Sequence, residues 1–452
     1  MSKVTAASRP SELLPAAILG LLGTHGAMSR TELAAGLRVS SATITQVSKG
    51  LIARGMVVEL GQMASGGGRP ARPLALVGSA GTIVGVKVAA SHLAVVAAGL
   101  DGSVLESTTW PFDATRPDGI DAAGRLLQGF LADAPQPVLG VGVGVPGAVD
   151  SPESGVADSP TIGWRAAPVG AAWRARLGVP VLVENDVNAL AVAEQVYGVG
   201  REYATYLVVT VGRGIGCGIV IDGAVYRGAG GGAGELGHIP VTVSDAEQAG
   251  ETVRTTADPP GNNGSHPDDR PFAQPACPYG HSGCLESYIG APGLLRRARE
   301  MGLADILDDG PGHPIDELTA LRRLAAAAPG DPRVGALFSW AGSLLGTAVA
   351  GTVNLLDPEV VVILGEGTEH WPLWETGFET ALRARLIGPR RLIPYRVEAW
   401  DERRWAVGAA ALVIATAFDR QGTTGRQGQL VRSRLSAAAV GPPAEPGPRA
   451  GS

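Results

Sequence analysis

The first 60 residues show a helical repeat of apolar positions interrupted by two short polar turns. Apolar side chains recur every three or four positions over residues 11–22, 29–37 and about 41–54. An extended stretch follows at 57–60, and another resumes at 74–76 after a segment rich in glycine, arginine and proline. Three helices followed by a hairpin are typical of a winged helix-turn-helix, which we predict over residues 1–78.

The third predicted helix has a polar face opposite its apolar face, and Ser40 or Ser41 can cap its start. This face and the hairpin supply the candidate DNA contacts Ser41, Thr43, Thr45, Gln46, Lys49, Arg69 and Arg72. Such side chains reach base edges and phosphates when a helix enters the major groove, and an arginine on a glycine-rich tip can enter the minor groove. We therefore expect double-stranded DNA as the partner; a protein-binding module of three short helices is the alternative.

Beyond residue 80, apolar strand-like runs alternate with helical patterns. The predicted strands are 82–88, 93–98, 138–145, 179–183, 206–211 and 218–221, and the longer predicted helices are 188–197, 290–301, 333–355 and 404–418. A strand-turn-strand unit that ends at Asp101-Gly102 recurs with its end at Asp222-Gly223. The pattern indicates an α/β body with two related lobes.

Charge divides the chain in the same way. The net charge is −6 overall, but residues 1–80 carry eight basic and three acidic side chains, so a basic head precedes an acidic body. A polyanionic partner is therefore expected for the head alone. No uninterrupted apolar run approaches the length of a membrane span, so we expect a cytoplasmic protein without membrane contact.

Five ordered motifs carry a resemblance to a known family. They are Gly142-Val-Gly-Val-Pro146-Gly147, Glu184-Asn185-Asp186-Val187-Asn188, Gly212-Arg213-Gly214-Ile-Gly216, Gly234-Glu235-Leu-Gly-His238 and Gly283-Cys284-Leu-Glu286. Together with the head, they resemble the ROK (repressor, open reading frame, kinase) family. The resemblance implies an actin-like, sugar-kinase-type body with a carbohydrate in the cleft between its lobes.

On this basis we expect a first lobe over 79–190, completed by about 400–418, and a second lobe over 191–399. The second lobe would include a flexible insertion at 243–276, and residues 419–452 read as a disordered tail because they are rich in glycine, proline and alanine. Residues 430–435 could form a weak helix within that tail.

The resemblance implies a sugar-binding set, because carboxylates and amides suit the hydroxyl groups of a carbohydrate. The set is Pro146, Gly147, Asn185, Asp186, Glu235, His238 and Glu286. In the kinases of the family, the position of Asp186 removes a proton from the sugar hydroxyl. The alternative for Asp186 and Asn188 is capping of the helix that follows.

A zinc site is predicted from the spacing of cysteine and histidine. Cys277, His281 and Cys284 lie within one short loop, and His238 can be the fourth ligand. The family's usual cluster has three cysteines, and His281 is our replacement for the missing one. We expect a structural Zn²⁺; two reduced buried thiols beside an exposed histidine are the alternative. Cys217 reads as a core residue.

The phosphate-binding motifs of the kinases are altered. Where the kinases have an aspartate, two glycines and a threonine, this chain has Lys87, Ala89, Ala90 and Ser91, and Arg213 replaces a small hydroxyl residue. An ammonium group at Lys87 would repel Mg²⁺. We therefore expect neither ATP nor Mg²⁺, and in a later glycine turn Glu366 stands in place of a second glycine.

The expected function is that of a sugar-responsive repressor. A homodimer, or a dimer of dimers, would bind an inverted-repeat operator, and a sugar or sugar phosphate in the cleft would change its affinity for DNA. The alternatives are an ATP-dependent, glucokinase-like sugar kinase, in which Asp186 would be catalytic, and a DNA-binding regulator without ligand control.

Overall fold

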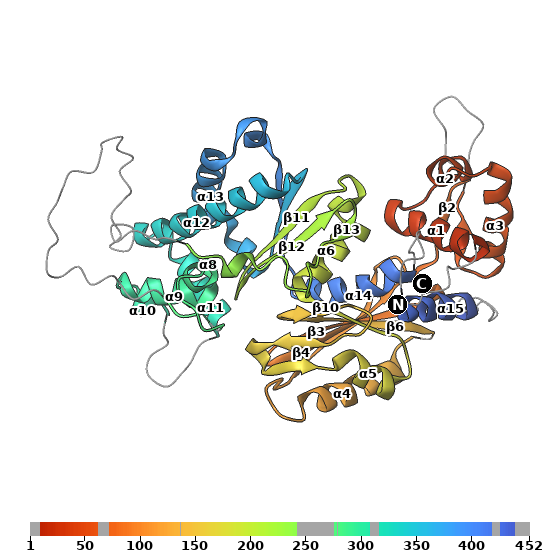
Figure 1. Cartoon of the computed structure of the whole chain (residues 1–452), viewed down its shortest axis with the longest axis horizontal. Helices are drawn as coiled ribbons and strands as arrows, with labels where there is room; N and C mark the ends of the chain where they lie inside the picture. The colour runs from red at the N-terminus through yellow and green to blue at the C-terminus, as the bar shows by residue number, and fades with distance from the viewer. Residues whose placement is uncertain are drawn as a thin grey trace, which may run out of the picture. The chain divides into compact units, whose positions relative to one another are not determined.

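The computed structural model describes residues 10–61, 72–135, 137–241, 275–277, 279–307, 316–417 and 425–438 (Figure 1). The chain divides into two compact units. Unit 1 comprises Met1–Thr205, Gly218–Ala233 and Glu402–Ser452, and unit 2 comprises Tyr206–Cys217 and Gly234–Asp401. Unit 1 thus contains the N-terminal head and the first lobe, and unit 2 contains most of the second lobe.

Three helices and a two-stranded wing form the head, as the sequence predicts. They are α1 (Pro10–His25), α2 (Arg30–Leu37), α3 (Ser41–Ala53), β1 (Val57–Glu59) and β2 (Leu74–Leu76). Ser29 and Glu32 form a capping box at the start of α2, and the Ser40 hydroxyl caps α3 by accepting from the Thr43 N–H at 3.1 Å. β1 pairs antiparallel with β2, and the wing tip, residues 62–71, lies outside the described residues.

A short, well-anchored connection joins the head to the body. The 3₁₀ turn η1 (Gly78–Ala80) separates β2 from the next strand. The Val77 N–H donates to the Met56 carbonyl at 2.9 Å, and the Leu100 N–H donates to the Gly78 carbonyl at 3.0 Å. A Cβ atom on Gly78 would collide with the Asp101 carboxylate, so a side chain where the connection touches the body would force that carboxylate to move.

A five-stranded sheet forms the centre of the first lobe. In spatial order its strands are β10 (Val181–Asn185), β6 (Val138–Val145), β3 (Thr82–Val88), β4 (His92–Gly99) and β5 (Val104–Pro111). β10, β6 and β3 are parallel, and β4 and β5 follow as an antiparallel meander. All residues of β3 and β6 are buried, as expected of strands covered on both faces.

Helices pack on both faces of this sheet. They are α4 (Gly119–Asp133), α5 (Val169–Leu177), α6 (Asp186–Tyr197), α14 (Arg403–Ala417) and α15 (Arg426–Ala438). α14 lies across β3, β4 and β6 (Figure 1). It approaches so closely that a Cβ atom on Gly85 or Gly142 would collide with the carbonyl oxygen of Ala406 or Ala409. A small sheet of β7 (Ala148–Val149), β8 (Ala157–Ser159) and β9 (Trp164–Ala167) completes the lobe.

A second five-stranded sheet repeats the order of the first. Its strands are β13 (Ala224–Val225), β12 (Ile215–Ile221), β11 (Tyr206–Val211), β14 (Val360–Leu364) and β15 (Tyr395–Val397). β11, β14 and β15 are parallel, and β12 and β13 form an antiparallel hairpin. The hairpin turns at Gly102 and Gly223 both have positive φ, so the predicted internal repeat is present in the fold.

The helices of unit 2 surround its half of this sheet. They are α8 (Leu285–Ile289), α9 (Ala291–Glu300), α10 (Ala304–Leu307), α11 (Glu317–Ala326), α12 (Pro332–Leu356) and α13 (Trp371–Arg385), with the 3₁₀ turns η4 (Leu236–His238) and η5 (Glu366–His370). Among the described residues, α12 alone has the length and composition of a membrane-crossing helix, but 61% of its apolar window is buried. It packs against α13 as a core helix.

The structure corrects three sequence-based boundaries. α6 begins at Asp186 rather than at 188, because Asn185 caps it. Unit 1 continues to Thr205 rather than ending near 190, because α6 packs on α14. The tail expected to be disordered contains α15, whose Val431 and Leu435 are buried in a cluster with α14. Most of the predicted insertion, residues 243–274, lies outside the described residues.

Candidate functional site

Asn185, at the start of α6, is the N-cap of this helix. Its Oδ1 accepts from the backbone N–H groups of Val187 and Asn188, both at 3.0 Å. Its Nδ2 donates to the Gly147 carbonyl oxygen at 2.9 Å. The capping role that the sequence left open for Asp186 and Asn188 therefore belongs to Asn185.

The parallel strands β6 and β10 end side by side at this site. Val145 and Asn185 are partners in the strand register, so Pro146 and Gly147 follow β6 directly beside Asn185. A Cβ atom on Gly147, whose φ is +86°, would collide with the Asp158 carbonyl oxygen. The motif residues thus meet at the carboxyl ends of parallel strands, the usual ligand-binding edge of α/β sheets.

Lys87 of β3 is an unpredicted partner of Asp186. Its Nζ forms an ion pair with Asp186 Oδ2 and lies 4.7 Å from the centre of the Trp405 ring. Asp186 Oδ1 accepts from the Val187 N–H at 2.9 Å. Both ionic side chains are 11% exposed. The cation that the sequence suggested would repel Mg²⁺ therefore neutralises the carboxylate expected to contact sugar.

Glu184 is a second buried carboxylate, and the sequence analysis missed it. It is 1% exposed and accepts from Arg227 Nε at 2.5 Å. Its Oε1 also accepts from the Asn185 N–H at 2.9 Å and from Asn188 Nδ2 at 3.3 Å. An acid within the apolar strand 181–185 was the available signal, since a buried carboxylate requires partners.

The remaining sugar-set residues belong to unit 2. Glu286 of α8 accepts from the Ile215 N–H at 2.9 Å, and a Cβ atom on Gly214 would collide with the carboxylate. Glu235 is exposed, with Oε2 lying 3.6 Å from His238 Nε2. The predicted set therefore forms two groups, one in each unit, and a shared cleft between them remains a prediction.

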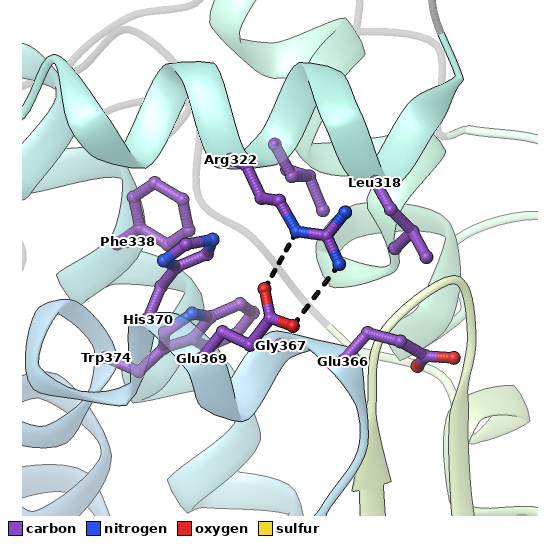
Figure 2. A pocket seen from close by; sticks show the side chains of 9 residues that line it. Leu318, Arg322, Phe338, Glu366, Gly367, Glu369, His370 and Trp374 are labelled. Atoms are coloured by element: carbon purple, nitrogen blue, oxygen red, sulfur yellow. Dashed lines mark hydrogen bonds and ion pairs between the residues drawn. The ribbon is translucent and has the colours of Figure 1, made fainter. Parts of the chain in front are cut away.

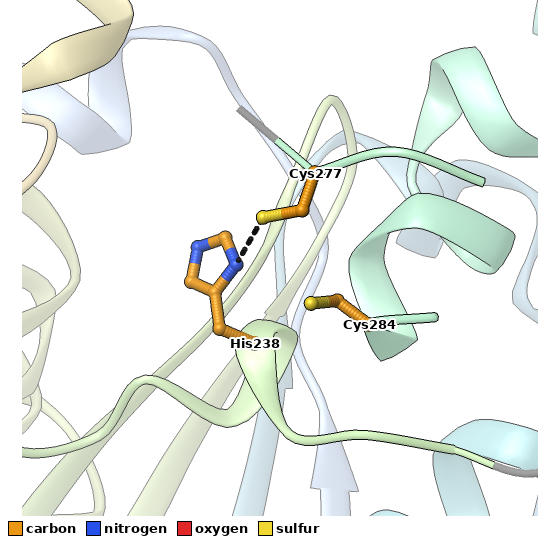
Figure 3. Close-up of side chains that lie close together, drawn as sticks. All are labelled: His238, Cys277 and Cys284. Atoms are coloured by element: carbon orange, nitrogen blue, oxygen red, sulfur yellow. Dashed lines mark hydrogen bonds between the residues drawn. The ribbon is translucent and has the colours of Figure 1, made fainter. Parts of the chain in front are cut away.

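Three of the four predicted metal ligands converge in unit 2. The ligand atoms of His238, Cys277 and Cys284 lie within 4.8 Å of one another, and their side chains point toward one another (Figure 3). His238 Nδ1 lies 3.3 Å from Cys277 Sγ. His281 is exposed, but its Nδ1 lies 2.8 Å from Cys284 Sγ, at the edge of the same cluster.

The donor chemistry of this cluster fits a zinc ion. Two thiols and two imidazoles are a common tetrahedral ligand set for zinc. Burial, followed by the hydrogen bond and charge of Cys277 and the charge of Glu286, raises the pKa of the Cys284 thiol to about 11. Without a cation the thiol therefore stays protonated near neutral pH, and a bound metal would displace its proton. Cys217 is buried elsewhere, as predicted for a core residue, and burial raises the pKa of its thiol to about 12.

Arg213, in the turn between β11 and β12, is also paired. Its Nη2 lies 2.5 Å from Asp316 Oδ1, and its Nη1 lies 3.5 Å from Glu317 Oε2. Burial alone would raise the pKa of the Asp316 carboxyl. The hydrogen bond and the charge of Arg213 lower this pKa by more, so it lies below its ordinary value. The guanidinium group that could have held a phosphate already has two carboxylate neighbours.

The glycine turn after β14 encloses only a small hollow (Figure 2). It is lined by Leu318, Leu321, Arg322, Phe338, Glu366, Gly367, Glu369, His370 and Trp374. Its free volume is about 10 Å³, and Arg322 binds Glu369 through two contacts of 2.8 and 3.2 Å. Glu366 turns away from Arg322, and a Cβ atom on Gly212 would collide with its carboxylate. Among the described residues, carboxylates occupy the surroundings of this turn, which disfavours a nucleotide phosphate.

The predicted DNA contacts are placed on the surface of the head. Ser41, Thr43, Gln46 and Lys49 are exposed on α3, Thr45 is half-buried, and Arg72 is exposed beside β2. Thr45 Oγ1 donates to the Ser41 carbonyl at 2.7 Å, which turns its hydroxyl toward its own helix. Arg69 lies outside the described residues. The polar face of α3 is therefore available as a recognition surface.

Two known proteins are similar to most of this chain. The xylose repressor of Caldicellulosiruptor bescii is 25% identical over 395 residues, covering 86% of this chain and 92% of the repressor. A crystal structure of a ROK family transcriptional regulator, a homolog of the E. coli MLC protein, has a TM-score of 0.69 at 23% identity and covers 94% of this chain and 99% of that one. The latter confirms the fold along the head and body together.

A sugar kinase is similar to a smaller part of this chain. The ROK family glucokinase of Streptomyces griseus, solved with glucose and AMPPNP, is 27% identical with a TM-score of 0.58, covering 73% of this chain and 98% of the kinase. The regulator matches extend over more of the chain than this kinase match. A sequence profile of the ROK family matches residues 83–416. The chain therefore belongs to the ROK family.

Proposed function

We propose that this chain is a sugar-responsive transcriptional repressor that binds operator DNA with its head and a neutral sugar with its body. The observation that carries the proposal is the pairing of both candidate phosphate anchors, Lys87 and Arg213, with carboxylates in a chain that also has a winged helix-turn-helix. The sugar-facing groups are retained, whereas the cations that could serve a nucleotide are already neutralised.

The DNA contact is assigned to α3 and the wing. Thr43, Gln46 and Lys49 project from the exposed face of α3, and the head carries a net positive charge although the whole chain is negative. A helix of this kind enters the major groove, and a twofold-symmetric dimer presents two such helices to an inverted repeat. The proposal therefore includes a homodimer or a dimer of dimers that acts on DNA in the cytoplasm.

The ligand is proposed to be an uncharged sugar. Asp186 and Asn185 would accept and donate hydrogen bonds to hydroxyl groups from unit 1, and Glu235, His238 and Glu286 would do so from unit 2. Pro146 and Gly147 would line the same site. The cations that could bind a phosphate group, Lys87 and Arg213, are paired with carboxylates. Two further carboxylates, Glu235 and Glu286, belong to the proposed site, which favours the sugar over its phosphate ester.

A zinc ion is proposed to hold the second group together. His238, Cys277, His281 and Cys284 would be its ligands. Because Glu286 follows Cys284 by two residues and Glu235 precedes His238 by three, the metal would fix the positions of two sugar-binding carboxylates. Its role in this proposal is structural.

The test starts with the selection of an operator sequence. A randomised duplex library is selected on the full-length protein, and fluorescence anisotropy then measures affinity with and without D-glucose, D-xylose, N-acetylglucosamine or glucose 6-phosphate. We expect at least one neutral sugar to change operator affinity by about tenfold, a typical allosteric coupling, and glucose 6-phosphate to have less effect. Gln46→Ala should weaken DNA binding, whereas Asp186→Asn should remove the sugar response alone.

The same preparations separate the alternatives. Release of ADP from Mg-ATP in the presence of these sugars at enzymatic rates would establish a kinase and overturn the proposal. Binding to DNA without any response to the panel, and without calorimetric heat on sugar addition, would instead support a regulator without ligand control.

A further inference from the structure

Lys87 contacts the beginnings of two helices at once. Its ammonium group pairs with Asp186, the first residue of α6, and faces the ring of Trp405 in the first turn of α14. A second link joins the same helices, since Arg404 Nη2 lies 3.8 Å from Glu194 Oε1. The Lys87 side chain therefore connects the expected sugar carboxylate to α14.

This connection is sensitive to what Asp186 binds. Among the described residues, Lys87 binds Oδ2 of the carboxylate and the Val187 N–H donates to Oδ1. A sugar hydroxyl that donates to either oxygen shares the carboxylate charge with Lys87, and the ammonium group compensates through its other neighbour, the aromatic face of Trp405. Burial strengthens this exchange, because the low dielectric increases the energy of each contact.

α6 and α14 are also the helices that contact the head. α1 packs against both of them. Ile18 and Leu22 of α1 belong to one buried cluster with Val196 of α6 and Ile414 of α14. Arg201, in the turn after α6, donates to the carbonyl oxygen of Gly23 at 3.4 Å. A change in the packing of α6 against α14 therefore reaches α1 directly.

We propose that Lys87 is a positioning residue that couples sugar binding at Asp186 to the head, by linking the start of α6 to the start of α14. This inference rests on the proposed sugar-responsive function and adds the residue that transmits the response. Lys87 fixes the direction of the Asp186 carboxylate before the sugar arrives. When a sugar hydroxyl binds that carboxylate, Lys87 shifts its contact toward Trp405. The packing of α6 against α14 then changes, and this change reaches α1.

The experiment uses the full-length dimer, operator DNA and whichever of D-glucose, D-xylose or N-acetylglucosamine binds the wild type by calorimetry. Lys87→Met removes the charge at similar length and Lys87→Arg retains it. Arg213→Met is the control, at a cation in the strand-turn-strand unit of the second sheet. Each protein is labelled with fluorotryptophan, and the ¹⁹F resonance of Trp405 is assigned from its loss in Trp405→Phe.

In the wild type we expect the sugar to shift the Trp405 resonance and to change operator affinity. In K87M we expect sugar affinity to fall about tenfold, as for loss of a charge-assisted contact, and saturating sugar to leave both the resonance and operator affinity nearly unchanged. K87R should restore a partial response, and R213M should respond as the wild type does. A merely structural role for Lys87 would lower stability but leave the response at saturating sugar intact.

Two failures are distinguishable. If no sugar binds the wild type, the proposed function fails and takes this inference with it. If sugar binds and K87M responds with the wild-type change in operator affinity, the inference alone is overturned. Should K87M be too unstable to purify, Lys87→Gln keeps a hydrogen-bond donor without the charge, and a full sugar response in that variant would equally overturn the inference.

Discussion

The first strand-turn-strand unit of each sheet carries a cation, but the surroundings of the two cations differ. Lys87 stands near the end of β3, with its side chain 11% exposed and paired with Asp186. Arg213 follows β11 in the second sheet, with its side chain 48% exposed and paired with Asp316 and Glu317. A buried pair is part of the framework, because neither partner can return to water alone, whereas an exposed pair competes with solvent and salt. Both cations replace residues of the kinase phosphate-binding motifs. The comparison teaches that such a replacement can become part of the buried framework, as at Lys87, or stay an exposed ion pair that solvent and salt can weaken, as at Arg213.

The largest effect is expected from Lys87→Met. Removal of the ammonium group leaves a buried carboxylate with a single backbone partner, which typically costs about 3 to 5 kcal/mol of the free energy of unfolding. Urea unfolding followed by circular dichroism measures the change. K87M/D186N should recover most of the loss. A K87M protein as stable as the wild type would mean that the buried Lys87 pair contributes no more than the exposed Arg213 pair.

Loss of the metal should come next and should act in the other lobe. We expect plasma mass spectrometry to find one zinc ion per chain in the wild type and none in Cys277→Ser. At zinc concentrations about 100-fold above its dissociation constant, this removes about 2.7 kcal/mol of stabilisation. Cys217→Ala, at a buried thiol outside the cluster, should retain the metal; loss of zinc from both variants would contradict the site.

Arg227→Met removes the ion-pair partner of the buried Glu184 carboxylate. It tests whether burial of a carboxylate determines how much stability is lost when its partner is removed. Glu184 keeps its two amide donors in this variant, so we expect a loss of about 2 kcal/mol, less than for K87M. Arg165→Met, at an exposed position of β9, is the matched control and should cost little. Equal losses in both variants would mean that the Glu184 pair is no more important than a surface arginine.

The smallest effect is expected from Arg213→Met, no more than about 0.5 kcal/mol at neutral pH. Because the Arg213 contact lowers the pKa of Asp316, its contribution is present above the ordinary aspartate pKa and disappears as the pH falls through the lowered value. Wild type and R213M should therefore converge in acid. Thermal unfolding across a pH series measures this, and a growing difference in acid would be inconsistent with the pair.

The fold was largely accessible from the sequence, because its central strands are continuous apolar runs and its head has regular helical spacing. β3 and β6 fall at the predicted residues. For α15 the sequence indicated only a weak helix over 430–435, because its composition is polar and only a few apolar residues, Val431 and Leu435 among them, anchor it. Packing against α14 orders this segment, and such tertiary packing overrides local propensity.

Within the site, local spacing was informative and long-range pairing was not. Cys277, His281 and Cys284 fall within one loop, so their proximity could be predicted. Lys87 and Asp186 are 99 positions apart, and Glu184 and Arg227 are 43 apart. Nothing in the spacing of either pair indicates contact, because the register of β3 with β6 and the path of the chain after β13 bring them together.

The anchored connection between head and body sets a rule for exchanging heads within the family. Since Gly78 fits against Asp101 without a side chain and η1 leads directly into β3, the head continues into the strand that carries Lys87. A graft joined before Gly78 keeps this connection intact. We expect such a chimera to bind the operator of the head's donor and to respond to the sugar that this body binds. One extra residue within η1 would change how the head is oriented on β3. We expect both parts of such a graft to fold, but sugar binding would no longer change operator affinity.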